Sequence, residues 1–267
     1  MVSEKKQDQF KTIFNAQFTT IELMWLSSKI AIVSQIETSS KFNVFFSLVS
    51  RFIENKTIIC NNEEIETLEH IYPGFSKTTW NKQDIARALL MIDLPISVNK
   101  AVLTSFFEIA EMKEQVSLYK NLYLLQNASE FKSQVAEGIR TNMVNVFDAI
   151  ASGNPFASSY LDDNEWNQLI LKSFFMDRKI YNIQNIDTRK NENLANMLQD
   201  YVKERWAAGR QVSLEIWRMI DGYLRDDIKV LCSKKQFEGI EKEVMHKILE
   251  SNNSASPQYW NTIGKEH

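Results

Sequence analysis

The chain has 267 residues, of which 44% are hydrophobic and 24% are charged, and these values are typical of a globular protein with a sizeable core. Its 31 basic and 34 acidic residues are intermixed and give a net charge of −3, so the sequence lacks the basic surface with which nucleic-acid-binding proteins neutralise phosphates. With only 7 glycines and 4 prolines to interrupt helices, we expect long helices rather than many short strands.

No targeting or membrane-spanning pattern is present near the start of the chain. The first residues are charged and lack the apolar stretch of a secretory signal. The most apolar early segment, residues 23–36, is interrupted by Lys29 and is shorter than the roughly 20 apolar residues of a membrane span. Cys60 and Cys232 stand alone, as expected of small buried residues in a reducing compartment. The sequence therefore predicts a cytoplasmic protein without a transmembrane segment.

Helical periodicity runs through the first half of the sequence. An apolar stripe with the spacing i, i+3, i+4, i+7 begins at Ile85 and follows three residues that could cap a helix, Thr78, Thr79 and Asn81. The other helices expected here lie near residues 5–18, 20–37, 41–55, 62–71, 97–111 and 114–125.

The second half continues the helical pattern and carries clearer helix ends. Asn127 with Glu130 marks one helix start, and Asp162 with Glu165 forms a variant of the capping box. An apolar stripe that starts at Leu194 ends at Gly209, a suitable residue just beyond a helix C-terminus. Further helices are expected near residues 142–152, 213–223 and 235–250.

The expected fold is therefore all-α. Short helices joined by short loops favour stacked antiparallel helix pairs, as in an irregular α-solenoid, although no fixed-period repeat is present. We expect a single helical domain over residues 1–250 with a weak seam near residues 125–130, followed by a flexible polar tail over residues 251–267.

The sequence contains no common catalytic or nucleotide-binding signature, such as GxGxxG, GxxxxGK[ST], GxSxG or HExxH. Its histidines, His70, His246 and His267, have no second metal ligand at helical spacing, and each is better explained as an ordinary surface or core residue. We therefore expect no catalytic residue, no metal site and no cofactor.

Polar and aromatic residues become denser after residue 136. The candidate ligand-binding residues are Arg140, Asn142, Asn145, Asp148, Asn167, Asp200, Glu204, Arg205, Trp206 and Arg210. Asp200 and Glu204 are four residues apart, which places two like charges on one helix face unless a cation lies between them. In one interpretation these groups form satisfied salt bridges that fix helix packing. In the other they line a pocket in which arginines bind an anionic group and a tryptophan stacks on the ligand.

Several motifs of this half occur together. They are Glu137–Asn142 (EGIRTN), Val146–Ala151 (VFDAIA), Asn154-Pro155, Trp166–Leu169 (WNQL), Asp187–Arg189 (DTR) and Asp200–Arg210 (DYVKERWAAGR), with Asp84–Met91 and Leu118–Lys120 upstream. This set resembles the EboA family from about Phe46 to Trp217, and its most diagnostic part is residues 136–217. One residue departs from the family pattern, because Lys203 stands where a histidine is expected.

The resemblance implies a pathway context rather than a reaction. EboA-like proteins accompany a UbiA-type prenyltransferase and other enzymes in moving a metabolite or its precursor from the cytoplasm to the periplasm. The implied partners are other Ebo-type pathway proteins, among them a membrane prenyltransferase, and a small anionic or aromatic metabolite. A peripheral position at the inner membrane would then arise through those partners.

Three functional hypotheses remain open. The leading one is a non-catalytic helical adaptor or metabolite-binding protein of an Ebo-type pathway. The second is an enzyme that uses Asp200 or Glu204 as acid or base, which Lys203 disfavours if the family histidine transfers protons. The third is a protein-docking scaffold without a small-molecule site, which predicts an exposed apolar patch.

Overall fold

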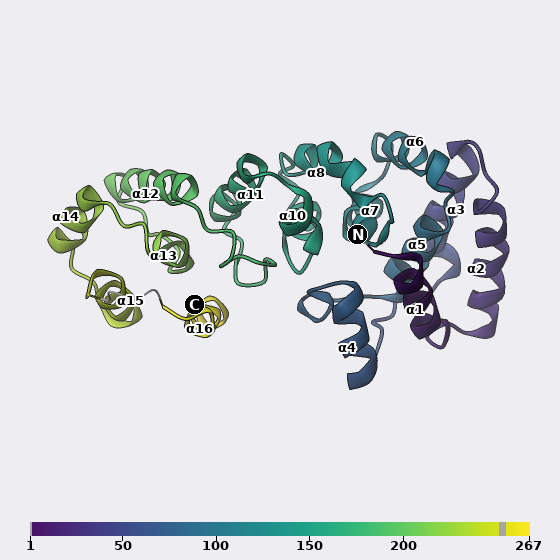
Figure 1. Ribbon diagram of the computed structural model, residues 1–267, viewed down its shortest axis with the longest axis horizontal. Helices are drawn as coiled ribbons and strands as arrows, with labels where there is room; N and C mark the ends of the chain where they lie inside the picture. The colour runs from purple at the N-terminus through teal and green to yellow at the C-terminus, as the bar shows by residue number, and fades with distance from the viewer. Residues whose placement is uncertain (1, 251–254) are drawn as a thin grey trace. The chain divides into compact units, whose positions relative to one another are not determined.

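A computed structural model describes residues 2–250 and 255–267 (Figure 1). Within these residues the chain consists of α-helices and short 3-10 helices and contains no β-strand, although Thr57 and Asn81 form an isolated antiparallel bridge. The expected all-α class is therefore confirmed. No helix within the described ranges is long and apolar enough to span a membrane.

The chain divides into two compact units, Met1–Leu161 and Asp162–His267. The boundary lies beyond residues 125–130, where the sequence indicated a weak seam. No linker marks the boundary, because the side chain of Asp162 accepts a hydrogen bond from the backbone N–H of Glu165 and so begins the next helix.

The first unit is arranged around one almost fully buried helix, α5. Every residue of α5 except Gln83 is buried, and the helix packs against α1, α2, α3 and α7, while α7 packs against α9. The α-helices are α1 (Glu4–Asn15), α2 (Thr20–Val33), α3 (Ser39–Phe52), α4 (Asn62–Ile71), α5 (Lys82–Ile92), α6 (Ile96–Phe107), α7 (Met112–Asn121), α8 (Lys132–Gly138), α9 (Val144–Ala151) and α10 (Pro155–Tyr160). The 3-10 helices are η1 (Phe75–Lys77), η2 (Leu122–Leu124) and η3 (Ala128–Phe131).

The second unit is arranged around the short helix α13, all of whose residues are buried. Helix α13 packs against α12 on one side and against α16 on another, and α12 also packs against α11. The helices are α11 (Asp163–Phe175), α12 (Glu192–Ala207), α13 (Glu215–Ile220), α14 (Asp226–Lys234), α15 (Gly239–Glu250) and α16 (Pro257–Glu266).

Most of the predicted helix ends have the capping hydrogen bonds or the backbone conformation that the sequence indicates. Asn81 and Asp162 each form a capping box. Gly209 adopts a positive φ of 68° just after α12, a conformation that favours glycine. The helix start predicted at Asn127 is confirmed, because η3 begins at Ala128. The Asn127 side chain, however, makes no cap at the start of η3 and instead forms a reciprocal amide pair with Asn99, with N···O distances of 2.8 and 2.9 Å.

The helix α16 differs most from the sequence-based expectation, which placed a flexible polar tail over residues 251–267. Residues 251–254 lie outside the described residues, but residues 257–266 form a helix that is N-capped by Ser256. Trp260 is fully buried and Ile263 is 4% exposed, and α16 contacts α13. This part of the tail is therefore packed through its apolar face, and α10 and α14 are two further helices that the sequence did not predict.

Glu22, in the first turn of α2, carries a buried negative charge. Its carboxylate accepts hydrogen bonds from Lys82 Nζ at 2.8 Å and from the backbone N–H groups of Thr19 and Glu54 at 2.8 and 2.9 Å. Burial by itself raises the pKa of Glu22, but these hydrogen bonds outweigh it and lower the pKa from 4.5 to about 2. Because the pKa in the folded state is the lower one, this contribution to stability is present above pH 4.5 and is lost as the pH falls toward 2.

Replacing Glu22 by glutamine is therefore expected to reduce the pH dependence of the melting temperature between pH 4.5 and pH 2. Thermal unfolding followed by circular dichroism at several pH values in this window measures the effect. Glu37→Gln, at an exposed position, is the matched control and is expected to follow the wild-type curve. A Glu22→Gln curve as steep as that of the wild type would contradict the assignment.

Candidate functional site

The ten candidate residues fall in both units. Residues 140, 142, 145 and 148 belong to the first unit, and residues 167, 200, 204, 205, 206 and 210 belong to the second. Each group is therefore described by itself.

The group in the first unit lies around the start of α9. Arg140, Asn142 and Asn145 are exposed, and Asp148 is half-buried on α9. The Arg140 guanidinium lies 3.1 Å from the Glu137 carboxylate, and both side chains are more than 60% exposed. A surface ion pair of this kind contributes little to the stability of the fold. These residues form an open polar surface.

In the second unit, Asn167 takes part in a structural contact. Its amide group forms reciprocal hydrogen bonds of 2.9 and 3.2 Å with the amide of Asn191. Asn191 is also the N-cap of α12, where its Oδ1 accepts from the backbone N–H of Leu194 at 2.9 Å. Asn167 is 2% exposed, and the pair joins α11 to the beginning of α12.

Asp200 and Glu204 share an exposed face of α12. Asp200 Oδ1 lies 2.8 Å from Arg225 Nη2, which also contacts Asp227 at 3.0 Å. Lys203 lies 2.9 Å from Asp227. Hydrogen bonds from Arg225 and Lys203 lower the pKa of Asp227, and the two aspartates raise the pKa of Arg225. This is the arrangement of a surface salt-bridge network, and it engages Asp200 with an arginine instead of leaving it in an open pocket.

The C-terminal end of α12 brings together the remaining candidates. We call the following set the Trp206 corner: Arg205, Trp206, Arg210, Lys235 and Phe237. Trp206 is half-buried, with Lys235 Nζ 4.5 Å from its ring centroid and the Phe237 ring 6.1 Å away. Arg205 donates from Nε and Nη2 to a backbone carbonyl at 3.0 and 2.7 Å, and Arg210 is exposed.

Two members of the Trp206 corner could not be found from the sequence. Lys235 and Phe237 were expected inside a helix over residues 235–250, but they lie in the connection between α14 and α15. Their position beside Trp206 depends on tertiary packing. The Trp206 indole N–H is buried and has no hydrogen-bond partner within the described residues, which leaves a donor unsatisfied.

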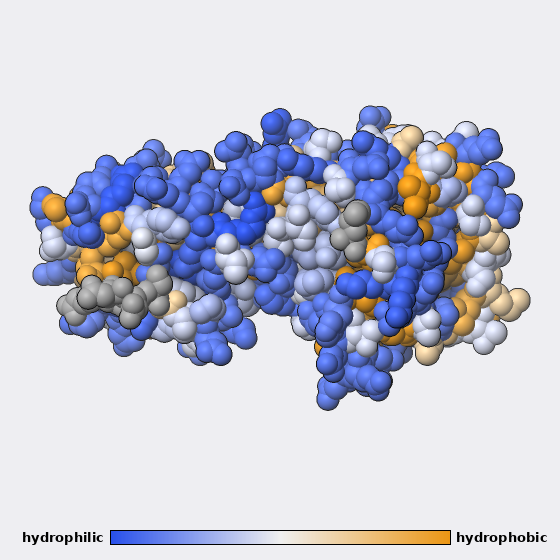
Figure 2. Space-filling model, in the orientation of Figure 1, coloured by the Kyte–Doolittle hydropathy of each residue, from blue (hydrophilic) through white to orange (hydrophobic). Residues whose placement is uncertain are grey.

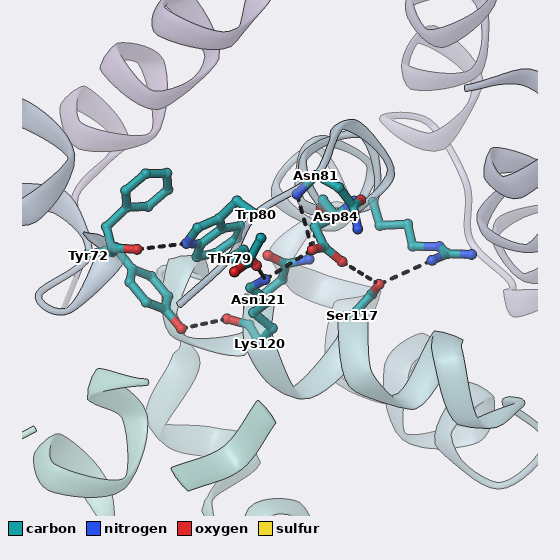
Figure 3. Close-up of polar contacts among 10 residues, drawn as sticks. Tyr72, Thr79, Trp80, Asn81, Asp84, Ser117, Lys120 and Asn121 are labelled. Atoms are coloured by element: carbon teal, nitrogen blue, oxygen red, sulfur yellow. Dashed lines mark hydrogen bonds and ion pairs between the residues drawn. The ribbon is translucent and has the colours of Figure 1, made fainter. Parts of the chain in front are cut away.

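A second polar cluster, which we call the buried polar centre, lies in the core of the first unit (Figure 3). Its members are Asp84, Arg87, Ser117, Lys120 and Asn121. Each of them is at most 6% exposed. Lys120 Nζ contacts Asp84 Oδ2 at 2.9 Å, Ser117 Oγ donates to Asp84 Oδ1 at 3.1 Å, and Arg87 Nη1 donates to Ser117 Oγ at 3.1 Å.

Neighbouring groups enclose the buried polar centre. Lys120 also donates to the Thr79 carbonyl, and its ammonium lies 4.2 Å from the centroid of Trp80. The Tyr72 hydroxyl donates to the Lys120 carbonyl at 3.0 Å, so this network connects α5 and α7 to the segment that follows α4 (Figure 3). Burial lowers the pKa of Lys120, while the Asp84 charge opposes that effect. The charges are paired and enclosed, which is typical of a structural network.

A groove of about 380 Å³ runs between α1 and α4. It is open to solvent and is lined by side chains that include Lys5, Asp8, Thr12, Glu63 and Thr67. None of the ten candidate residues lines it. Across the described ranges no group of three or more His, Cys, Asp and Glu side chains is arranged to hold a metal ion.

Comparison with known protein families gives a match over most of the chain. The sequence model of the family described as "Metabolite traffic protein EboA" matches residues 6–221, so the matched region ends directly after α13 and excludes α14, α15 and α16. No curated protein and no solved structure matches the chain. Because the family match covers most of the sequence and includes the motifs around the buried polar centre and the end of α12, the chain belongs to the EboA family.

Proposed function

We propose that this chain is a non-catalytic adaptor of metabolite traffic that binds a small anionic metabolite at the Trp206 corner. The family is described as a metabolite traffic protein, which supports a role in handling metabolites. In this proposal, binding supports the movement of a secondary metabolite or its precursor from the cytoplasm to the periplasm. Other Ebo-type proteins, including a membrane prenyltransferase, would supply and receive the metabolite.

The observation that carries the proposal is the position of the Lys235 ammonium over one partly exposed aromatic ring, Trp206, with two arginines nearby in the sequence. Lys235 lies over Trp206, while Arg205 precedes it and Arg210 follows the end of α12. Arg205 is held in place by bonds to the neutral Gln211 carbonyl, so its charge is oriented without being neutralised by that contact. A ligand with a phosphate or carboxylate group would meet several donors here.

Four tryptophans have a buried indole N–H without a partner within the described residues, and Trp206 is the one of them whose side chain is half-buried rather than buried, which supports the same site. A buried donor without an acceptor costs about 1–3 kcal/mol. A ligand oxygen that reached Trp206 Nε1 after a shift of Lys235 would remove this penalty, and the ring itself offers a surface for stacking. The expected ligand is therefore anionic and carries an aromatic or otherwise flat apolar part.

A thermal-shift screen tests the proposal. The panel comprises phosphorylated sugars, prenyl diphosphates and aromatic carboxylates, with neutral cyclitols as the uncharged comparison. A ligand at 100 times its Kd stabilises the folded state by about 2.7 kcal/mol, which raises the melting temperature by several degrees. We expect at least one anionic compound to give this shift, and we expect the shift to be lost in Lys235→Gln and reduced in Trp206→Phe.

Lys229→Gln is the matched control for the screen. Lys229 is an exposed lysine of α14 that pairs with Asp226 at 2.9 Å, and it is not part of the Trp206 corner. It is expected to retain the full ligand-induced shift. The proposal would be contradicted if no anionic compound stabilised the wild type, or if stabilisation were the same in Lys235→Gln.

A further inference from the structure

Helix α2 is apolar on both its buried and its exposed sides. Leu26 and Val33 face the core, and the charged Glu22 is buried with them. On the opposite side Ile21 and Met24 are 81% and 70% exposed. The exposed side of a surface helix is normally polar, so this arrangement requires a physical explanation.

Helix α3 extends the apolar surface. Val44 and Phe52 are 54% and 46% exposed. The Phe52 ring stacks on Trp25 of α2, with ring centroids 5.0 Å apart and planes 12° apart, so the two helices form a seam at this ring pair. We call this surface the α2–α3 face. Figure 2 shows white to orange atoms, together with blue ones, on the side of the first unit where α2 and α3 lie in Figure 1.

Cationic residues accompany the α2–α3 face. Lys29 lies with its ammonium 5.2 Å from the Phe45 centroid, and Lys41 and Arg51 are exposed on α3. The one acidic residue within these two helices, Glu22, is buried and neutralised by Lys82 at 2.8 Å. Two exposed acidic residues flank the helices, Glu37 between them and Glu54 just after α3. The helices therefore present apolar side chains together with three positive charges.

We infer that the α2–α3 face docks directly on an anionic lipid surface. The positive charges of the α2–α3 face favour a lipid surface over a second copy of the chain. A second copy of the chain would bring the same cations against one another, whereas acidic headgroups would complement them. This inference is independent of the metabolite site, because the Trp206 corner belongs to the other unit.

The dimensions of α2 suit this contact. A helix of 14 residues is about 21 Å long, and when it lies flat its exposed apolar side chains reach the boundary between headgroups and acyl chains. Trp25, which is half-buried at the seam, would lie at headgroup level, where tryptophan is enriched. Lys29, Lys41 and Arg51 would meet the lipid phosphates.

Vesicle flotation with the full chain tests the inference. We expect binding to vesicles containing about one-third phosphatidylglycerol in phosphatidylcholine, with at least about tenfold weaker binding to pure phosphatidylcholine. The double substitution Ile21→Ser with Met24→Ser is expected to reduce the bound fraction about tenfold or more, because it removes two apolar anchors. Lys41→Gln with Arg51→Gln is expected to abolish the preference for anionic lipid.

Val230→Ser is the matched control, since Val230 is an apolar residue of α14 that is 52% exposed. It is expected to float as the wild type does. All variants replace exposed side chains, and circular dichroism checks that they remain folded. The inference is overturned if the wild type does not bind anionic vesicles, including a case in which the α2–α3 face instead mediates dimerisation or captures an acidic protein. Binding that is unchanged by Ile21→Ser with Met24→Ser also overturns it.

Discussion

Replacement of Lys120 by methionine is expected to lower the free energy of unfolding by about 3–5 kcal/mol. Asp84 and Lys120 have side chains that are 9% and 8% exposed, and their charged atoms are 2.9 Å apart. Removing the cation leaves a buried carboxylate that keeps the Ser117 hydroxyl at 3.1 Å and the Asn81 backbone N–H at 3.4 Å but loses its ion-pair partner. It also removes the ammonium that lies over Trp80.

Chemical denaturation of wild type and variant at neutral pH measures this effect. Lys100→Met is the matched control, because Lys100 is an exposed lysine of the neighbouring helix α6, and it is expected to change stability by less than about 0.5 kcal/mol. The double variant Asp84→Leu with Lys120→Met is expected to recover part of the lost stability, since it removes the unpaired charge. A Lys120→Met protein within about 1 kcal/mol of the wild type would show that the buried polar centre does not hold α5 and α7 together.

Replacement of Trp260 by alanine is expected to remove about 3–5 kcal/mol of packing energy from the contact between α16 and α13. Trp260 is fully buried, and its helix approaches α13 closely at Gly264, where an added Cβ would lie 2.6 Å from Glu215 Oε1. The loss is therefore expected to release α16 locally before the rest of the unit unfolds.

Hydrogen exchange followed by mass spectrometry measures this release. Amides in residues 257–266 are expected to exchange much faster in Trp260→Ala, while those of α12 keep most of their protection. Gln258→Ala, at an exposed position of the same helix, is the control and is expected to leave the exchange rates unchanged. Unchanged protection of residues 257–266 in Trp260→Ala would mean that α16 is held by other contacts.

Features that depend on a few consecutive residues could be predicted from the sequence. The capping residues Asn81 and Asp162 and the positive φ of Gly209 arise from local hydrogen bonding and local sterics. The helix start at Asn127 was also placed correctly, but the Asn127 side chain does not cap η3, because its amide is engaged by Asn99 on another helix. A hydrogen-bond partner on another helix cannot be recognised from the residues that surround Asn127 in the sequence.

The C-terminal helix and the candidate site residues also depend on contacts between segments that are far apart in the sequence, which local patterns do not reveal. Residues 257–266 follow a polar segment, and nothing in the local composition shows that Trp260 fits against α13. The spacing of Asp200 and Glu204 correctly placed both on one face of α12. Whether that face is buried depends on the distant segment that begins α14, where the N-cap residue Arg225 pairs with Asp200. The family motifs around Asp84 and Lys120 were recognised in the sequence, although their burial as an ion pair became visible only in the fold.

We expect the chain to bind an anionic metabolite without converting it, and equilibrium dialysis followed by mass spectrometry tests this expectation. Wild type, Lys235→Gln and Lys229→Gln are dialysed against the same anionic panel. We expect one compound to accumulate with the wild type and with Lys229→Gln, to be recovered chemically unchanged, and not to accumulate with Lys235→Gln. Recovery of a converted product, or equal accumulation with Lys235→Gln, would contradict this expectation.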